Sequence, residues 1–412
     1  MKYLYNTLMY ISEKLILFFG IFFGQKTKYF VQGQREAFKK LSHCIQTDKT
    51  KVWFHVSSLG EYEQALPIIE KIKKHYPDYQ LILTFFSPSG YEVIKKHATV
   101  DCISYLPWDT LKNVRKFLDL IQPKLVFFVK YDFWPNYLYE LKKRNIPVYL
   151  IAGLFRANHS FFKPYNAWLK KSLSAFHHFF VQDVNSKNVL IRQGFSSVTV
   201  TGDTRFDRVY QLAQTSNNLE FIEHFKQNQP LLVAGSTWKT DENILIPIIN
   251  ENNNFKTVIA PHNISDNHIK SITKQIKKPY ILFTEITENK DLSNFDVLII
   301  NQIGLLKTIY RYADVVYIGN GFGKSIHNIQ EPAVYGVPII TGPNIDKFNE
   351  AVDLNKLGGL TVVHNEEELK KIIDKLFSNE YLRKQQAQIT RDYVQKNIGS
   401  SQLILDYLKD KL

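Results

Sequence analysis

Cysteine is scarce in this chain, which contains only two among 412 residues. Neither Cys44 nor Cys102 has a second cysteine or a histidine at the spacing of a metal site. These facts exclude a disulfide-rich framework and a cysteine-rich zinc site, and they favour a reducing compartment. The histidines are scattered and no H-E-x-x-H motif occurs, so we assign no metal.

Acidic residues are also in short supply: 39 Asp and Glu stand against 52 Lys and Arg, which gives a formal net charge of +13. Such an excess suits three kinds of anionic partner, namely nucleic acid, a membrane surface or a substrate. No basic stripe with interleaved aromatic residues occurs outside the N-terminus, which argues against nucleic acid. The chain is 44% hydrophobic and 14% aromatic, and this composition excludes a disordered protein.

Long hydrophobic runs are absent as well. The N-terminal stretch Leu15–Gly24 is apolar, but Glu13 and Lys14 separate it from the apolar residues before it, and a bilayer span needs about 20 apolar residues. No small-residue cleavage site of signal-peptide type is present. Since lysines flank this stretch, we predict an in-plane or shallow anchor over residues 1–30, attracted to anionic lipid. The alternative is an N-terminal helix packed on the core.

Beyond residue 51, short apolar runs alternate with longer amphipathic stretches. This alternation predicts an α/β fold with parallel sheets covered by helices on both faces. It pauses at the polar stretch Gln211–Pro230 and then restarts, so we predict two Rossmann-like domains joined near residue 210, with a cleft between them. No repeat of fixed period occurs, which argues against a solenoid. The predicted strands are Val52–Val56, Leu81–Phe86, Leu125–Val129, Val148–Ile151, Phe179–Val181, Leu231–Ala234, Thr257–Ala260, Asp296–Ile300, Val315–Ile318 and Val337–Ile340.

In open α/β sheets, ligands collect where strands end and helices begin. The first such junction is Val56–Glu61, where Gly60 permits close backbone approach and Glu61 opens a helix. A carboxylate there can act as a general base toward a hydroxyl. The simpler interpretation, which the spacing alone favours, is that Glu61 complements the helix dipole.

Three further junctions follow. Lys130–Asn136 contains a proline at an early helix position and by itself indicates only a helix start. Gly235–Thr237 is a small hydroxyl-bearing turn that suits either a phosphate or a sugar carboxylate, or simple N-capping. Gly319–Ser325 is glycine-rich and includes Lys324, but it matches neither G-x-x-x-x-G-K nor G-x-G-x-x-G, so an NTPase or a dinucleotide enzyme has weak support. Glu331, beyond it, suits the hydroxyls of a ribose.

These junctions, in this order, resemble the Kdo transferases, which attach 3-deoxy-D-manno-octulosonic acid (Kdo) to the lipid A precursor of Gram-negative envelopes. The resemblance covers nearly the full length of the chain. It rests on the segments His55–Glu61, Trp134–Asn136, Val200–Asp207, Ala234–Thr237, His327–Ala333 and Gly342-Pro343.

The resemblance implies a GT-B architecture, with the donor CMP-Kdo bound mainly by the C-terminal half and the acceptor bound near the membrane by the N-terminal half. The expected boundaries are 1–30 for the anchor, 31–209 for the acceptor-binding domain, 210–390 for the donor-binding domain and 391–412 for a C-terminal helix that packs back on the N-terminal domain.

Carried over residue by residue, the family pattern makes Glu61 the catalytic base, with Asp132 and Arg205 as further catalytic residues. Three positions depart from the pattern: Arg205 replaces a lysine, Lys130 replaces the first acid of E-T-E, and Pro261 stands where P-R-H would supply an arginine. We expect Ser58 and Gly60 on the acceptor side. The donor-binding residues implied by the junctions and the resemblance are Gly235, Ser236, Pro261, His262, Ile303, Gly304, Leu305, Lys324, Asn328, Ile329, Gln330 and Glu331.

The expected activity is an inverting, metal-independent transfer of Kdo from CMP-Kdo to the lipid A precursor, at the cytoplasmic face of the inner membrane and against its anionic surface. Two alternatives remain. One is another membrane-associated GT-B enzyme that uses a UDP-sugar, such as a lipid A disaccharide synthase. The other is a non-catalytic protein that binds anionic lipid and retains the fold.

Overall fold

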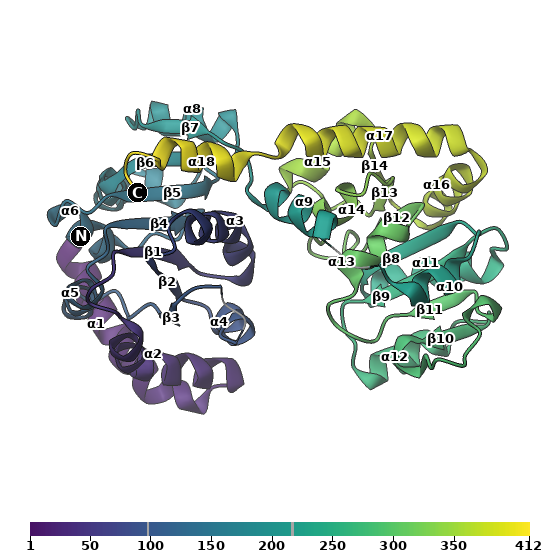
Figure 1. The fold of residues 1–412 in the computed structure, drawn as a ribbon, viewed down its shortest axis with the longest axis horizontal. Coiled ribbons are helices and arrows are strands. Elements are labelled where there is room, and N and C mark those ends of the chain that lie inside the picture. Colours follow the sequence, from purple (N-terminus) through teal and green to yellow (C-terminus); the bar gives the residue numbers. More distant parts are fainter. Residues whose placement is uncertain (97–98, 216–217) are drawn as a thin grey trace. The chain divides into compact units, whose positions relative to one another are not determined.

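The computed structural model describes residues 1–96, 99–215 and 218–412. They form two compact units: unit 1 comprises Met1–Arg208 and Ile398–Leu412, and unit 2 comprises Val209–Asn397. Each unit is built on one seven-stranded sheet whose paired strands run parallel, with helices between successive strands (Figure 1). The prediction of an α/β fold with parallel sheets is therefore confirmed.

The sheet of unit 1 has the strand order β3-β2-β1-β4-β5-β6-β7. Its strands are β1 (Lys51–Val56), β2 (Gln80–Phe85), β3 (Cys102–Tyr105), β4 (Leu125–Val129), β5 (Val148–Gly153), β6 (Phe176–Val181) and β7 (Val198–Val200). Its helices are α1 (Lys2–Phe19), α2 (Gln25–Cys44), α3 (Leu59–His75), α4 (Pro88–Ile94), α5 (Leu111–Ile121), α6 (Pro135–Lys143), α7 (Ala167–Ser172), α8 (Val184–Arg192), α18 (Ser400–Leu408) and the first turn of α9 (Arg205–Thr215).

The sheet of unit 2 has the order β10-β11-β9-β8-β12-β13-β14. Its strands are β8 (Leu231–Thr237), β9 (Lys256–Pro261), β10 (Tyr280–Leu282), β11 (Val297–Ile299), β12 (Val315–Ile318), β13 (Ile339–Thr341) and β14 (Leu360–Val362). Its helices are α10 (Glu220–Lys226), α11 (Lys239–Glu251), α12 (Asp266–Thr273), α13 (Leu306–Ile309), α14 (Gln330–Ala333), α15 (Asn349–Leu357), α16 (Glu366–Ser378) and α17 (Glu380–Asn397).

Alternating side chains of the central strands supply two cores, one on each face of the sheet. In β1, Val52 and Phe54 belong to a cluster that contains Ile69 of α3. Trp53, which points to the opposite face, belongs to a second cluster with Phe117 of α5. Successive side chains of a strand face opposite sides, so a strand that is apolar throughout needs helices on both faces.

The C-terminal segment contains a break that the sequence did not predict. Gly399, in the left-handed conformation at φ +101°, separates α17 from α18. The backbone N–H groups of Gly399 and Ser401 donate to the carboxylate of Asp207, at 2.5 and 2.6 Å. Asp207, the last residue of the Val200–Asp207 motif, thus satisfies the first turn of α18.

The two cysteines meet although they are far apart in the sequence. Cys44 is the last residue of α2 and Cys102 the first of β3, and a disulfide joins them with a Cα–Cα distance of 5.6 Å. The spacing of the two cysteines did not predict this pairing, which arises because α2 packs along β3. One such bond is not the multi-bond framework that the low cysteine count excludes.

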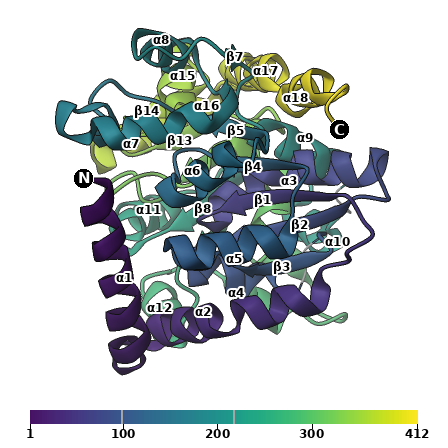
Figure 2. The same cartoon turned by 90° about the vertical axis from the view of Figure 1, so that its left-hand side faces the viewer.

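Helix α1 lies along the outside of unit 1 and joins α2 through a short 3-10 turn, Gly20–Phe22 (Figure 2). It contacts the unit through both polar and apolar groups. The Tyr5 hydroxyl donates to Asp109 at 2.6 Å, and the amide of Asn113 donates to Glu13 at 2.6 Å. Met9 and Ile16 pack against the core of the unit. None of its own residues is buried. Within the described residues, no helix has both the length and the apolar character needed to cross a membrane.

Candidate active site

The carboxyl ends of β1 and β4 lie side by side in unit 1, because β1 pairs with β2 on one side and with β4 on the other. The crossover from β1 leads to β2, whereas β4 starts the other half of the sheet. The loops that follow β1 and β4 therefore lead to opposite halves of the sheet, and such a reversal is where open α/β sheets bind ligands. Ser57–Glu61 follows β1 and Lys130–Trp134 follows β4.

Glu61 lies in the first turn of α3, just beyond β1. Ser58 is the N-cap, and its hydroxyl accepts from the Glu61 N–H at 3.4 Å. The Glu61 carboxylate accepts from the backbone N–H of Ser57 at 2.5 Å and is only 9% exposed. Burial raises its pKa above the ordinary value, and nearby Asp132 raises it further, while the Ser57 N–H, His55 and Lys130 offset part of this shift.

Asp132 has the opposite electrostatic environment. It accepts from His55 Nε2 at 2.8 Å, from Trp134 Nε1 at 3.0 Å and from the Ser57 hydroxyl. Burial alone raises the pKa of this carboxyl, but the hydrogen bond and charge of His55, together with the two other donors, lower it below its usual value. Asp132 is therefore held as a carboxylate.

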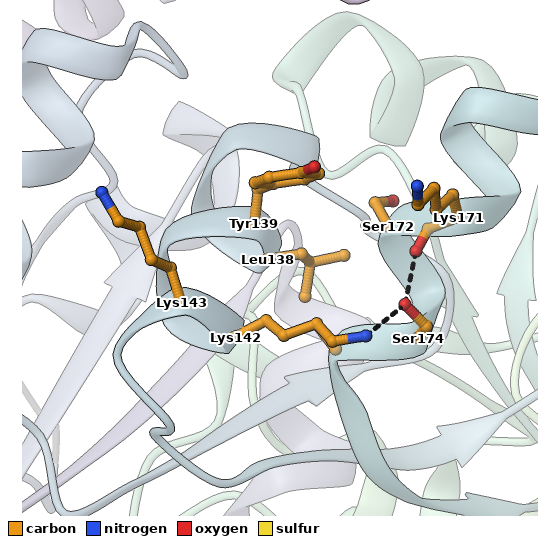
Figure 3. A pocket seen from close by; sticks show the side chains of 8 residues that line it. Leu138, Tyr139, Lys142, Lys143, Lys171, Ser172 and Ser174 are labelled. Carbon is orange, nitrogen blue, oxygen red and sulfur yellow. Dashed lines mark hydrogen bonds between the residues drawn. The ribbon is translucent and has the colours of Figure 1, made fainter.

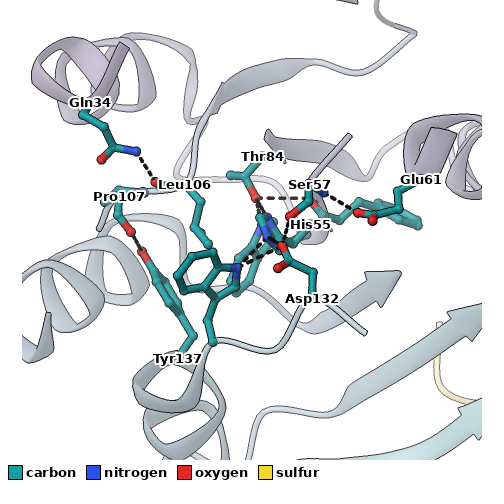
Figure 4. A network of polar contacts seen from close by, with 12 residues as sticks. Gln34, His55, Ser57, Glu61, Thr84, Leu106, Pro107, Asp132 and Tyr137 are labelled. Carbon is teal, nitrogen blue, oxygen red and sulfur yellow. Dashed lines mark hydrogen bonds and ion pairs between the residues drawn. The ribbon is translucent and has the colours of Figure 1, made fainter. Parts of the chain in front are cut away.

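His55 is fully buried in β1 and connects Asp132 to the neighbouring strand. Its Nδ1 lies 2.9 Å from the hydroxyl of Thr84, which also accepts from Trp53 Nε1 at 2.8 Å. The parallel register pairs His55 with Thr84, so this contact follows from the alignment of β1 with β2. The chain of contacts from β2 through β1 to the β4 loop fixes where Asp132 lies (Figure 4).

Ser57 connects the two carboxylates, since its N–H donates to Glu61 and its hydroxyl donates to Asp132 (Figure 4). Two neighbouring carboxylates with pKa values shifted in opposite directions have different chemical capacities. Glu61 is the stronger base and suits proton acceptance, whereas Asp132 supplies a fixed negative charge. Sequence reasoning did not assign a role to Ser57, His55 or Trp134, although all three lie within or beside the motifs that it used.

The other predicted residues of unit 1 have clear positions. Gly60 lies in the first turn of α3, and a Cβ there would meet no atom within 4 Å. Arg205 begins α9, and its guanidinium binds Asp203, with Nε at 2.9 Å and Nη2 at 2.6 Å. The amide of Gln64 on α3 also donates to Asp203, at 3.1 Å. Asp203 thus connects Arg205 to α3. Burial raises the pKa of Asp203, but the ion pair and hydrogen bonds with Arg205 lower it below its usual value.

In unit 2 the same reversal of strand order occurs between β8 and β12, which are neighbours in the sheet. Gly235 and Ser236 lie at the end of β8, which is irregular there, with Ser236 at φ +53°. The loop after β12 approaches so closely that a Cβ on Gly319 would collide with the carbonyl oxygen of Ser236. The glycine at 319 is required by this close backbone approach.

The predicted residues Pro261 and His262 follow, Pro261 as the last residue of β9. His262 stacks on Trp238 with ring centroids 4.7 Å apart, and on His327 at the same distance. Trp238 Nε1 donates to His327 Nε2 at 3.0 Å. Burial, assisted by His262, lowers the pKa of His327 to about 4, so the ring is neutral and accepts this bond. Trp238, which the sequence did not single out, is the exposed end of this aromatic group.

Ile303, Gly304 and Leu305 form the turn before α13, with Ile303 82% exposed and Gly304 at φ +103°. Lys307, in the next turn, makes an ion pair with Glu331 of α14 at 3.4 Å. The helix that follows the Ile303–Leu305 turn is therefore in contact with the segment that ends at Glu331.

The segment that ends at Glu331 has its own internal bonds. The side-chain oxygen of Asn328 accepts from the Gln330 N–H at 2.9 Å, while Ile329 and Gln330 are buried. Lys324 is exposed in the glycine-rich loop after β12. Across the described residues, no group of three or more His, Cys, Asp or Glu side chains is arranged to bind a metal ion.

Replacing Asp132 by Asn removes the charge that faces His55. We expect D132N to lower the free energy of unfolding at neutral pH by about 2 kcal/mol, as for other hydrogen bonds to buried charged groups. Because the folded-state pKa of Asp132 lies below the ordinary value of 3.8, this contribution is complete above that value and is lost as the pH falls through the folded pKa.

Denaturant unfolding of the wild type and of D132N over a range of pH measures this effect. The exposed Asp78 provides a matched control, since D78N changes the same charge without touching His55. Equal stabilities for D132N and D78N at neutral pH would contradict the electrostatic role of the His55–Asp132 pair.

The comparisons with known proteins agree with this geometry. A family model for 3-deoxy-D-manno-octulosonic acid transferases matches residues 32–208. The 3-deoxy-D-manno-octulosonic acid transferase of Haemophilus influenzae is 25% identical, with 100% of this chain and 99% of that protein covered. The enzyme of the same name from Aquifex aeolicus is 27% identical over 82% of this chain and 88% of its own length.

Solved structures show the fold. A UDP-GlcNAc 2-epimerase from Neisseria meningitidis has a TM-score of 0.63 at 17% identity and covers 88% of this chain and 100% of its own. A glycosyltransferase from Rickettsia africae has a TM-score of 0.57 at 15% identity, with 88% and 99% covered. The two sheets are thus those of a GT-B-like fold, and with full-length relatives of one name the chain belongs to the Kdo transferase family of glycosyltransferases.

Proposed function

We propose that this protein transfers Kdo from CMP-Kdo to the lipid A precursor at the cytoplasmic face of the inner membrane. The observation that supports it most is Glu61: a buried carboxylate of raised pKa at the strand-order reversal of unit 1, within the family's H-x-S-S-x-G-E segment. In this proposal unit 1 binds the acceptor, with Ser58 and Gly60 on the acceptor side, and unit 2 binds the donor.

Glu61 removes the proton from the primary hydroxyl of the acceptor's distal glucosamine as that oxygen attacks the anomeric carbon of Kdo. The bond from this carbon to the CMP phosphate oxygen breaks, and a single displacement of this kind inverts the anomeric configuration. The fixed charge of Asp132 raises the basicity of Glu61, because it disfavours a second negative charge nearby. The same charge stabilises positive charge that develops on the Kdo ring in the transition state.

The leaving CMP carries a phosphate whose charge requires compensation. Lys324, in the glycine-rich loop after β12, is suited to this, since no carboxylate partner faces it among the described residues. Arg205 contributes less directly, because its guanidinium already binds Asp203. In unit 2, the segment from Asn328 to Glu331 and the turn at Ile303–Leu305 bind the nucleotide. The ion pair between Lys307, in the helix after this turn, and Glu331 positions the Glu331 carboxylate for the ribose hydroxyls.

Attachment to the membrane is the second part of the proposal. Helix α1 carries five apolar side chains that are each about half exposed or more: Leu4, Leu8, Ile11, Leu15 and Phe18. This spacing places them on one face of the helix. The polar side chains of Tyr5 and Glu13 bind unit 1 instead. Met9 and Ile16 also pack against unit 1, so the helix docks by a face of mixed polarity. Its opposite face leaves the five apolar side chains for the lipid, which supports a shallow in-plane anchor over a helix packed into the core.

The Glu61 variant tests the catalytic part. General-base catalysis contributes about 10²- to 10⁴-fold, so we expect Glu61→Gln to lower kcat by that factor while CMP-Kdo binding is retained. In the wild type the rate falls as the pH drops through the Glu61 pKa, which lies above the ordinary 4.5, and Glu61→Gln loses this limb. The control is Glu63→Gln on the same helix, whose carboxylate faces Arg208. Near-normal turnover of Glu61→Gln would show that another group is the base.

Nucleotide specificity separates the proposal from the alternative of a UDP-sugar enzyme. We expect CMP at 100 times its Kd to stabilise the protein by about 2.7 kcal/mol against thermal unfolding, because a ligand that binds only the folded state shifts the equilibrium by mass action. UDP at the same concentration should give a smaller shift. Protection by UDP and none by CMP would favour the UDP-sugar enzyme.

Polar substitutions on the exposed face of α1 test the anchor. We expect the triple variant Leu8→Gln, Ile11→Gln, Leu15→Gln to lower partition onto membranes by roughly a hundredfold or more, since each large apolar side chain contributes about 1.5–3 kcal/mol when buried. The contacts of Tyr5 and Glu13 with unit 1 remain. The control, Val184→Gln, Leu357→Gln, Leu403→Gln, changes three exposed apolar residues elsewhere. If removal of residues 1–28 also left the chain with the membrane, this account of the anchor would fail.

A further inference from the structure

Unit 1 contains a cavity of about 260 Å³ between α6 and α7, separate from the two carboxylates (Figure 3). Three lysines line it: Lys142 and Lys143 at the end of α6, and Lys171 in α7. The apolar part of its wall comes from Leu138 and Tyr139, which Figure 3 shows between Lys143 on one side and Lys171 on the other. The cavity is smaller than the pockets of about 300–1,000 Å³ that hold drug-sized ligands, so it suits a small polar group.

The positive charge of this cavity is not neutralised by the protein. Lys142 Nζ donates to the hydroxyl of Ser174 at 2.8 Å, a neutral partner. Within the described part of the chain, no carboxylate forms an ion pair with Lys142, Lys143 or Lys171, and Glu140 on the same helix is already paired with Arg115. Three lysine side chains along the wall of one small cavity favour a compact anion with several acceptor oxygens, as a phosphate has.

The cavity is adjacent to the N-terminal end of α1. Lys2 Nζ lies 3.7 Å from the ring centroid of Tyr139, which lines the cavity. The ring of Tyr5 packs against Trp168 of α7, with centroids 5.0 Å apart. The apolar face of α1, which we propose to lie in the membrane, therefore begins beside this cavity. A phosphate at the level of the lipid head groups is within its reach.

The cavity also lies at a distance from the proposed chemistry. Helix α6 starts at Pro135, three residues after Asp132, and Lys143 is its last residue. The eight steps from Pro135 to Lys143, at 1.5 Å each, give about 12 Å between these two ends. A phosphate bound by Lys142 and Lys143 is thus at the other end of α6 from the catalytic carboxylates. This distance indicates that the bound phosphate belongs to a membrane lipid and not to the part of the substrate that reacts.

We propose that this cavity binds the phosphate and glycerol of an anionic glycerophospholipid head group. The inference rests on the proposed membrane attachment of α1. The lysine ammonium groups contact the phosphate oxygens, and Leu138 and Tyr139 contact the apolar part of the lipid nearest the head group. A choline head group is disfavoured, because its quaternary ammonium meets three lysines of the same charge. Bound lipid orients unit 1 against the membrane in addition to the apolar insertion of α1.

The experiment compares binding of the full-length protein to two kinds of vesicle, one of phosphatidylcholine alone and one in which a third of the lipid is phosphatidylglycerol. We expect the wild type to bind the anionic vesicles more tightly. The triple variant Lys142→Gln, Lys143→Gln, Lys171→Gln should bind them roughly 10- to 100-fold more weakly than the wild type, as expected for the loss of three lysines near a charged surface. Its binding to neutral vesicles should not change.

The matched control is Lys356→Gln, Lys371→Gln, Lys375→Gln, three exposed lysines of unit 2 that remove the same charge. It should keep the preference for anionic vesicles. If the cavity variant and this control behave alike, or if the wild type binds both vesicles equally, the proposed cavity site is overturned. If the wild type binds neither vesicle, the membrane attachment itself fails, which is a distinct outcome.

A competition experiment separates a lipid head group from free phosphate. Soluble glycerol 3-phosphate should displace the wild type from anionic vesicles at a concentration at which inorganic phosphate does not, and it should have no such effect on the cavity variant. Equal displacement by both compounds would identify a site for phosphate alone and would overturn the assignment to a glycerophospholipid.

Discussion

The reversal of strand order beside β1, and again beside β8, is the constraint on which the rest of this structure depends. At each reversal the chain leaves two adjacent parallel strands in opposite directions, so the two loops part at the carboxyl edge of the sheet. In unit 1 these loops carry Glu61 and Asp132, which lie 71 positions apart in the sequence. In unit 2 they carry Gly235 and Lys324. The two carboxylates of unit 1 and the glycine-rich loop of unit 2 are thus reached from such an edge.

The contacts of Ser57 explain how two neighbouring carboxylates acquire different properties. Its hydroxyl is one of three donors to Asp132, whereas its N–H donates to the Glu61 carboxylate and lowers the pKa of that group. Asp132 therefore retains its charge although it is partly buried, whereas burial raises the pKa of Glu61 above its ordinary value. The balance depends on His55, which is fixed by its pairing with Thr84 on the next strand. The basicity of Glu61 is thus set partly by the alignment of two strands.

The sequence predicts the elements that are strongly apolar. The predicted strands Leu125–Val129 and Val315–Ile318 match β4 and β12, because continuous runs of β-branched and aromatic residues in a parallel sheet are easy to recognise. Strands β3, β7, β10 and β14 were missed, since three or four residues with a polar or partly exposed member carry too weak a pattern. These short strands form through pairing with a neighbour and not through local preference.

The details of the site are less predictable than its location. The H-x-S-S-x-G-E segment indicates that Glu61 matters, but the contact of Ser57 with Asp132 joins residues 75 positions apart. The disulfide between Cys44 and Cys102 and the capping of α18 by Asp207 likewise depend on tertiary packing. The N-terminal helix shows the same limit. Its composition suggested either an anchor or a packed helix, and its contacts with unit 1, polar at Asp109 and Asn113 and apolar at Met9 and Ile16, show which face is left exposed.

We propose that this chain moves Kdo from CMP-Kdo to a lipid A precursor. The most direct measurement is mass spectrometry of the acceptor after incubation of the purified full-length protein with CMP-Kdo, or with a UDP-sugar, in lipid-containing micelles. The account predicts that the acceptor gains the mass of Kdo, with release of CMP, only when CMP-Kdo is the donor. An acceptor of unchanged mass with an intact, folded enzyme, or a sugar added from the UDP donor, would contradict it.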